Sequence, residues 1–285
     1  MSGGPDEFTK RALTGAVYVA LTLGAARAGL WTTFLLFLPV CVIGAREWHR
    51  LYFSRGEGDP GDWRTMTLAA VVFIAVSARR LLEDLPGGYG EVTVLGIVLV
   101  LAFDLMRRGV KDPARAFAGY LGTVLYIAVP FALTTRMVEW HWHVFVGFMF
   151  LLWTSDTGAY LVGRSIGRTK LMPSVSPGKT WEGLAGGVAL TMLVGWLLSK
   201  YWLDLSATQW MAAAATVAVT ATLGDLLESA FKRAKGVKDS GTILPGHGGI
   251  LDRFDGFLLA APAMVLVIAL FFAQITRTAL VICLP

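Results

Sequence analysis

Charged residues are scarce in this sequence. Only 16% of its 285 residues are Asp, Glu, Lys or Arg, whereas 55% are hydrophobic. Water-soluble domains carry about a quarter charged residues, so the composition argues against one or two soluble domains, which the length alone would allow. We therefore predict a polytopic integral membrane protein.

Cysteine is also scarce. Cys41 and Cys283 each stand alone in an apolar segment. They have no metal-ligand spacing and form no pattern typical of a disulfide framework. We interpret both as packing residues, because free cysteine is commonly buried.

Long apolar segments fill most of the chain. A hydrocarbon core of about 30 Å requires roughly 20 mostly apolar residues in a helix. We predict an all-α fold with about nine transmembrane helices; two of the segments are short, so the count is open by one or two. The predicted spans are 12–29, 30–45, 65–78, 91–105, 116–135, 143–163, 184–202, 208–227 and 254–275.

Lys and Arg are unevenly divided between the two sides of this arrangement. Nineteen of the 25 fall on the side of the N-terminus, and positively charged loops mark the cytoplasmic side. We predict a multi-pass protein of the cytoplasmic (inner) cell membrane with a cytoplasmic N-terminus. The net charge of +5 then suits anionic lipid and anionic nucleotide, and we expect no nucleic-acid partner.

The sequence divides into two regions. Residues 1–115 are expected to form about four N-terminal transmembrane helices. Residues 116–285 are expected to form a C-terminal transmembrane catalytic region, whose loops 164–183 and 228–253 lie on the cytoplasmic face.

Charge is concentrated in the segment 228–256, ESAFKRAKGVKDSGTILPGHGGILDRFDG, in which nine of 29 residues are charged. Asp225 precedes it, inside an apolar run, where an ionised carboxylate is costly unless paired and is a functional candidate. An internal ion pair that fixes helix packing is an equally open interpretation. Helical spacing places four polar residues on one face, namely Asp225, Glu228, Ser229 and Lys232.

The later part of the segment has the composition of a phosphate site. Glycines at 246, 248 and 249 let backbone N–H groups approach a ligand, and nearby Lys and Arg can hold phosphate. Asp225 and Asp252 come from two helix ends and can converge on Mg²⁺, which prefers one or two carboxylates plus water and phosphate oxygens. His247 is more typical of a hydrogen-bonding loop residue than of a magnesium ligand.

A second polar constellation occupies residues 154–183, TSDTGAYLVGRSIGRTKLMPSVSPGKTWEG. Asp156 is again a carboxylate within an apolar run. The motif SPGKT resembles half of a phosphate loop, but the first glycine of G-x-x-x-x-G-K-[ST] is missing and no strand precedes it. Gly178, Lys179 and Thr180 can still offer close backbone approach, a point charge and a hydroxyl. Alternatively, the motif is only a polar turn with a helix beginning near Thr180.

Two further polar segments are interpreted as features of the membrane interface. The motif REWHR at 46–50 is expected to be an interfacial anchor whose cations reach toward water. Glu139 and His143, at i and i+4, would allow a metal site on the opposite side of the membrane. The tryptophans that alternate with histidines at 140–143 favour an aromatic belt instead.

Two stretches resemble the phosphatidate cytidylyltransferases, also called CDP-diacylglycerol synthases. One is Ser229-Ala-Phe-Lys232-Arg233, followed by Lys238-Asp239 and by Pro245-Gly-His-Gly-Gly-Ile-Leu-Asp252-Arg253-Phe-Asp255. The other runs from Ser155-Asp156-Thr-Gly-Ala-Tyr160 to Ser176-Pro-Gly-Lys179-Thr180-Trp-Glu182-Gly183 and is similar to the bacterial members. The matches lie in the C-terminal half.

The resemblance implies an all-helical membrane enzyme of phospholipid biosynthesis. It would convert CTP and phosphatidate in the bilayer to CDP-diacylglycerol and pyrophosphate. The cofactor would be Mg²⁺, with more than one cation bound. A homodimer is possible. Carried over by position, the metal ligands are Asp225 and Asp252. The catalytic residues are Asp225, Lys232, Arg233, Asp239, His247 and Asp252, and the substrate-binding residues are Asp156, Ser176, Gly178, Lys179, Thr180, Glu182, Lys238 and Arg253.

Two other functions stay open on the residues alone. Asp156, Asp225 and Asp252 could bind coupling ions in an ion-coupled secondary transporter. A related lipid-phosphate or isoprenoid nucleotidyltransferase or kinase would need similar groups. Nucleotide binding distinguishes the transporter from the enzymes.

Overall fold

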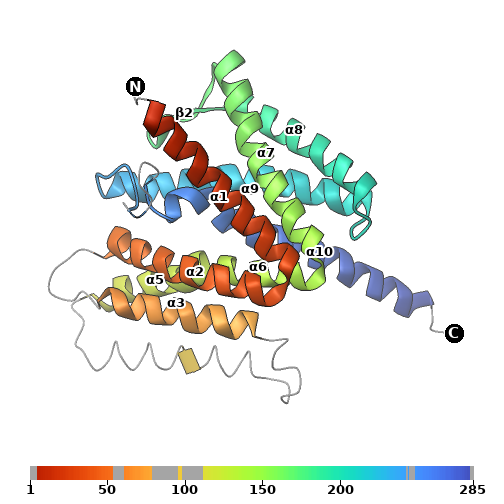
Figure 1. Cartoon of the computed structure of the whole chain (residues 1–285), viewed down its shortest axis with the longest axis horizontal. Coiled ribbons are helices and arrows are strands. Elements are labelled where there is room, and N and C mark those ends of the chain that lie inside the picture. Colours follow the sequence, from red (N-terminus) through yellow and green to blue (C-terminus); the bar gives the residue numbers. More distant parts are fainter. Residues whose placement is uncertain are drawn as a thin grey trace. The chain divides into compact units, whose positions relative to one another are not determined.

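The computed structural model describes residues 5–53, 61–78, 96–97, 112–241, 243 and 248–282, and side chains from residue 14 to residue 271. Helices make up nearly all of it (Figure 1). Its elements are α1 (Pro5–Ala28), α2 (Leu30–Tyr52), α3 (Asp62–Ser77), α5 (Pro113–Gly122), the π-helix η2 (Thr123–Ala128), α6 (Val129–Trp140), α7 (Trp142–Ile166), β1 (Lys170–Met172), β2 (Ser176–Thr180), α8 (Trp181–Tyr201), α9 (Ala207–Ala234) and α10 (Leu251–Ile282).

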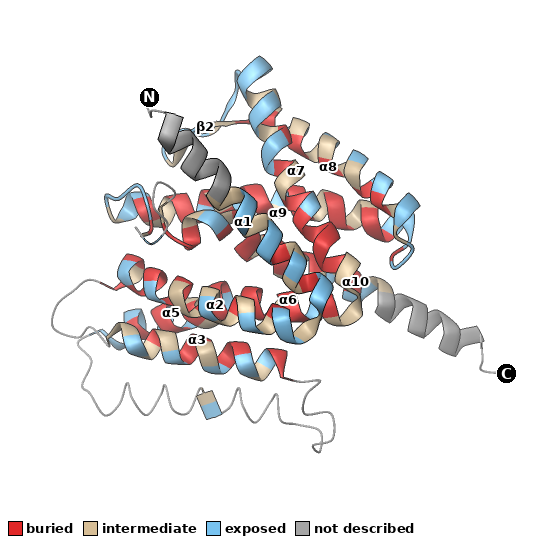
Figure 2. Cartoon of the chain, viewed as in Figure 1, coloured by how far each residue is buried: buried red, intermediate tan, exposed pale blue. Residues whose placement is uncertain are grey.

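Six helices in the described residues are long and apolar enough to cross a membrane. Their exposed apolar side chains support this reading: Leu193 on α8 is 51% exposed and Leu266 on α10 is 60% exposed. Figure 2 shows exposed and intermediate residues along much of α8. The predicted all-α membrane fold is confirmed. The six spans are Leu30–Tyr52, Pro113–Trp140, Trp142–Ile166, Trp181–Tyr201, Ala207–Ala234 and Leu251–Phe271.

The remaining predicted spans differ from these six. The spans expected at 12–29 and 65–78 correspond to α1 and α3, which are not among the six. With 16 residues, α3 is about 24 Å long, shorter than a hydrocarbon core of about 30 Å. Most of the span expected at 91–105 lies outside the described residues. The count of nine therefore stays a prediction.

The chain forms two compact units. Unit 1 comprises Met1–Arg136 and Phe231–Phe254, and unit 2 comprises Met137–Ala230 and Asp255–Pro285. The segment 231–254 thus groups with the N-terminal helices. The predicted division of the sequence at residue 115 into N-terminal helices and a catalytic region stays a prediction. Both α9 and α10 contribute residues to each unit.

Aromatic side chains form the core of unit 1. Phe37 and Phe131 are fully buried, and the ring of Phe254 lies 6.2 Å from the first and 5.1 Å from the second. The Trp48 indole donates to the Gly119 carbonyl at 3.1 Å. Trp48 packs so closely on α5 that a Cβ on Gly122 would lie 2.4 Å from its ring. Unit 1 therefore anchors the end of α2 firmly against α5.

Glycine allows the close pairing of α7 and α8 in unit 2. A Cβ on Gly187 would lie 2.9 Å from the Ser155 carbonyl oxygen, and one on Gly183 would lie 2.8 Å from that of Ala159. The two glycines form a G-x-x-x-G pattern, which lets two helix backbones approach closely. In lipid, where the hydrophobic effect does not drive helices together, such close packing stabilises the pair. This pairing fixes the position of the segment that joins α7 to α8.

That joining segment is a small antiparallel hairpin rather than a turn. β1 and β2 pair with Lys170 opposite Thr180 and Met172 opposite Ser176. The expectation that no strand precedes SPGKT was wrong. The preceding strand is short and largely exposed, however, so it differs from the buried strand of a phosphate loop.

Candidate active site

The hairpin of unit 2 directs Lys179 toward α9. Lys179 lies on β2, one residue before the cap of α8. Its Nζ lies 2.5 Å from Asp225 Oδ2 and 3.5 Å from the Thr222 carbonyl oxygen. The structure thus brings together the lysine of SPGKT and the aspartate inside the apolar run of α9, two residues that the sequence singled out separately.

Further carboxylates surround this pair. Asp156 on α7 and Asp255 on α10 both interact electrostatically with Lys179 and Asp225. The Ser229 hydroxyl donates to the other Asp225 oxygen at 3.2 Å. We call Asp156, Lys179, Asp225 and Asp255 the lysine–carboxylate cluster. It sets three carboxylates against one cation, an imbalance that favours a bound cation.

Residues beside Lys179 position the hairpin. The Thr180 hydroxyl caps α8 by accepting the Gly183 N–H at 3.1 Å, so the helix begins where the sequence suggested. The Glu182 carboxylate accepts the N–H groups of Arg168 and Thr169, each at 3.1 Å. Gly178 faces open space. Thr180 and Glu182 therefore hold the loop, and their predicted contacts with substrate stay predictions, as do those of Ser176 and Gly178.

A second polar cluster lies in unit 1 around Asp252. Its Oδ1 lies 2.7 Å from Lys232 Nζ. Its Oδ2 accepts the backbone N–H groups of Ser240 and Gly249, both at 2.8 Å, and the Ser240 hydroxyl at 3.0 Å. Through these bonds Asp252 holds Lys232, Ser240 and Gly249 of the charged segment against the start of α10. Because Asp252 belongs to unit 1 and Asp225 to unit 2, their joint metal site stays a prediction.

Glu47 completes this cluster, and the sequence reasoning missed it. Its carboxylate accepts the Ile250 N–H at 3.0 Å and the Leu251 N–H at 2.9 Å, and it shares with Asp252 the one proton of the Ser240 hydroxyl, which lies 3.1 Å away. Glu47 is only 1% exposed. The expectation that residues 46–50 form an interfacial anchor was therefore wrong for Glu47, because its carboxylate caps the N-terminus of α10. A glutamate between Arg46 and Trp48 in a largely apolar helix was the available signal.

The other cations of the charged segment are exposed, apart from the half-buried Lys235. Arg233 donates to the Val237 carbonyl at 3.2 Å. Burial, and then the neighbouring charge of Arg115, lower the pKa of Lys235. The repulsion between these two cations indicates a local excess of positive charge, which favours an anion. Lys238, Asp239 and Arg253 are exposed as well, and His247 lies outside the described residues.

The structure therefore groups the predicted residues in two sets. Asp156, Lys179 and Asp225 meet in unit 2, and Lys232 and Asp252 meet in unit 1. Asp255 was absent from the predicted set although it lies one helical turn after Asp252. Its spacing could have identified it, because residues three apart share a helix face.

Comparison with known proteins identifies the family. A model described as the cytidylyltransferase family matches residues 9–271. The chain belongs to this family. Phosphatidate cytidylyltransferase from Staphylococcus haemolyticus (strain JCSC1435) is 31% identical over 264 residues, which cover 89% of this chain and 96% of the relative. The enzyme of the same name from Staphylococcus aureus (strain COL) is 41% identical over 188 residues, covering 62% of this chain and 70% of the relative.

The family match extends beyond the two stretches quoted from the sequence. It includes residues 9–115, where the sequence showed little beyond apolar segments. A third relative, from Staphylococcus epidermidis (strain ATCC 12228 / FDA PCI 1200), is 49% identical over 123 residues, 42% of this chain and 47% of that protein. The predicted family membership is confirmed.

Proposed function

We propose that this chain transfers the cytidylyl group of CTP to phosphatidate and forms CDP-diacylglycerol and pyrophosphate. The observation that carries the proposal is the Lys179–Asp225 pair within the lysine–carboxylate cluster. The names of the family relatives support the same reaction. An ion-coupled transporter would have no evident need for a lysine held at a hairpin beside these carboxylates.

The reaction requires no nucleophile from the protein. A phosphatidate phosphate oxygen forms a bond to the α-phosphorus of CTP, and the bond from that phosphorus to the bridging oxygen of the β-phosphate breaks. Pyrophosphate leaves with the bonding electrons. The protein must neutralise charge and hold the two phosphates in line. Lys179 would meet a CTP phosphate, and Lys232 and Arg233 would meet further anionic groups.

The cluster also fits Mg²⁺. Hard carboxylate oxygens are the ligands that Mg²⁺ takes from proteins, and three of them face one lysine here. Asp225 would hold the ion, with Asp156 and Asp255 beside it and with Asp252 as the further ligand expected from the sequence. Bound Mg²⁺ would neutralise phosphate charge in the transition state.

The proposal includes an orientation in the membrane. With nine spans, the N-terminus, loop 164–183 and loop 228–253 face the cytoplasm, where CTP is available. The phosphatidate acyl chains then remain among the helices while the nucleotide enters from water. The excess of Lys and Arg on this side supports the orientation.

An assay that compares three acceptor lipids tests the proposal. Purified protein in detergent receives labelled CTP and Mg²⁺ with phosphatidate, with an ether analogue of phosphatidate or with a polyprenyl phosphate. We expect a labelled liponucleotide and stoichiometric pyrophosphate with phosphatidate. A product only with polyprenyl phosphate would instead identify an isoprenoid enzyme, and label transfer without pyrophosphate release would contradict cytidylyl transfer.

A further inference from the structure

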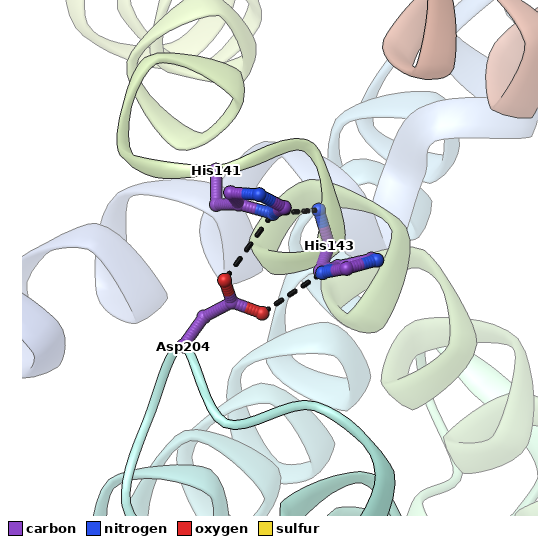
Figure 3. A group of neighbouring side chains, drawn as sticks. All are labelled: His141, His143 and Asp204. Carbon is purple, nitrogen blue, oxygen red and sulfur yellow. Dashed lines mark hydrogen bonds and ion pairs between the residues drawn. The ribbon is translucent and has the colours of Figure 1, made fainter.

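Two histidines and an aspartate, none of them in the lysine–carboxylate cluster, meet in unit 2 (Figure 3). His141 immediately precedes α7, His143 lies in its first turn, and Asp204 lies in the loop between α8 and α9. His141 Nδ1 lies 3.3 Å from Asp204 Oδ1, and His143 Nδ1 lies 2.9 Å from Asp204 Oδ2. These nitrogen and oxygen atoms all lie within 4.8 Å of one another.

A break in the helix creates this arrangement. His141 adopts an extended conformation, with φ −171° and ψ 145°, and separates α6 from α7. Within a continuous helix, side chains two residues apart would point to different sides. The break instead places the two imidazole rings 4.4 Å apart. It also takes Glu139 off the helix of His143, so the two residues do not stand at i and i+4 of one continuous helix.

The atoms that face one another in the cluster are largely acceptors. His141 Nδ1 accepts the backbone N–H of His143 at 3.3 Å, so it carries a lone pair rather than a proton, and a metal ion bound to that lone pair would replace this hydrogen bond. Asp204 Oδ1, the atom opposite it, is also an acceptor. Two acceptors at this separation repel each other, and a cation placed among them would convert the repulsion into binding.

The His143 ring is held in place by its neighbours. It stacks on Trp202, with ring centroids 4.8 Å apart and planes inclined by 14°. The Trp142 ring lies 3.9 Å away. Side chains that are already fixed lose little freedom on binding, which favours a ligand.

We propose that His141, His143 and Asp204 bind a divalent transition metal ion, with Zn²⁺ as the best-suited ion. Zn²⁺ accepts imidazole and carboxylate ligands at about 2.0–2.2 Å, which places tetrahedral ligand atoms roughly 3.3 Å apart. The histidine nitrogens lie 3.3 and 2.9 Å from the two different oxygens of Asp204, and one ligand atom from each residue lies within 4.8 Å of the other two, so small side-chain shifts would bring the three to this spacing. Three protein ligands leave a fourth position for water or an external ligand. Mg²⁺ is excluded as the preferred ion because it favours oxygen ligands.

The bound ion would tie the start of α7 to the α8–α9 loop within unit 2. This role is separate from the proposed transferase reaction, whose residues lie in the lysine–carboxylate cluster. The metal site and the transferase activity can therefore fail or succeed independently.

Zinc titration of the purified full chain tests the site. After treatment with a chelator and its removal, the protein receives Zn²⁺, and bound zinc and the unfolding temperature in detergent are measured. We expect one zinc per chain and a higher unfolding temperature. In other metal sites, mutating residues that only hydrogen-bond to the ligands lowers metal affinity by about 10–100-fold. Loss of a ligand itself should cost more, so Asp204→Asn and His143→Gln should each weaken zinc binding by at least about 100-fold.

Matched variants make the outcome decisive. Glu139→Gln removes a nearby carboxylate outside the cluster and should bind zinc like the wild type, as should Lys179→Ala. Co²⁺ in place of Zn²⁺ should give the visible absorption of a tetrahedral site in the wild type and lose it in Asp204→Asn. Absence of bound zinc, or equal binding by wild type and both ligand variants, would overturn the proposal and leave a simple His–Asp ion pair. If Asp204→Asn does not fold, the same comparison with His143→Gln decides.

Discussion

At the scale of single residues, charge is placed where the fold can pair it. Lys179 lies against Asp225, Lys232 lies against Asp252, and Glu47 accepts two backbone N–H groups although it is buried. An uncompensated charge in an apolar setting is costly. These pairs are therefore where a substitution should have the clearest effect.

Lys179→Ala should reduce kcat/KM for CTP by about 10- to 150-fold. This range corresponds to a charge-assisted contact of roughly 1.5–3 kcal/mol. Lys179→Arg should restore activity only in part, because a planar guanidinium does not replace a compact ammonium. Steady-state kinetics with varied CTP and saturating phosphatidate measures the effect, and the apparent KM for phosphatidate should change less.

Lys170→Ala is the matched control for Lys179. Lys170 lies on the partner strand of the same hairpin, is exposed, and should tolerate Ala within a few-fold. Equal losses in the two variants would show that the hairpin is only a basic surface, and the assignment of Lys179 would be wrong.

Glu47→Gln should lower the unfolding temperature in detergent and reduce activity. Glutamine keeps the size but turns an N–H donor toward groups that are themselves donors, and a hydrogen bond to a charged group contributes about 1.5–3 kcal/mol. Thermal unfolding followed by tryptophan fluorescence measures the change. Asp62→Asn is the control: Asp62 pairs with Arg46 at the surface, where such pairs contribute at most about 1 kcal/mol. Equal stability of Glu47→Gln and the wild type would contradict the capping role.

At the scale of elements, the sequence was most informative about long helices. Apolar runs predicted the six membrane-spanning helices to within seven residues at their ends. SPGKT pointed to Lys179 and to the start of α8. The hairpin was missed because three- and five-residue strands leave little periodicity to detect. Glu47 was missed because its partners, at 240–251, lie about 200 residues away in the sequence.

Gly187→Leu should disrupt the pairing of α7 with α8. Even a Cβ at this position meets the Ser155 carbonyl oxygen at 2.9 Å, and backbone cannot move aside as a flexible side chain can. Overpacking typically costs about 1–3 kcal/mol, so the unfolding temperature should fall. Ala189→Leu adds bulk to the same helix at an exposed position and should have little effect. If both variants unfold alike, close glycine packing is not what holds this pair.

At the scale of the whole molecule, the membrane class followed from composition, whereas the two compact units did not. Segment 231–254 joins unit 1 through contacts with α2, such as those of Glu47, that no local pattern encodes. The orientation rests on the distribution of Lys and Arg. It can be tested without knowledge of the reaction.

Cysteine labelling should show the charged segment on the cytoplasmic side. In a background with Cys41→Ser and Cys283→Ser, Ala207→Cys should react with a membrane-impermeant thiol reagent in intact cells. Asp239→Cys should react only after the cytoplasmic face is opened. Both positions are exposed. The reverse pattern would contradict the predicted orientation.

The central claim is that the lysine–carboxylate cluster carries out cytidylyl transfer to phosphatidate. Its most direct test is the rate of liponucleotide formation from labelled CTP, phosphatidate and Mg²⁺ by Asp225→Asn, beside the wild type and Asp62→Asn. Asparagine keeps the size of Asp225 but removes its charge, so the rate should fall at least about 100-fold, as when a key electrostatic contact to a transition state is lost. Asp62→Asn should keep the wild-type rate. Near-normal turnover by a well-folded Asp225→Asn protein would contradict the account.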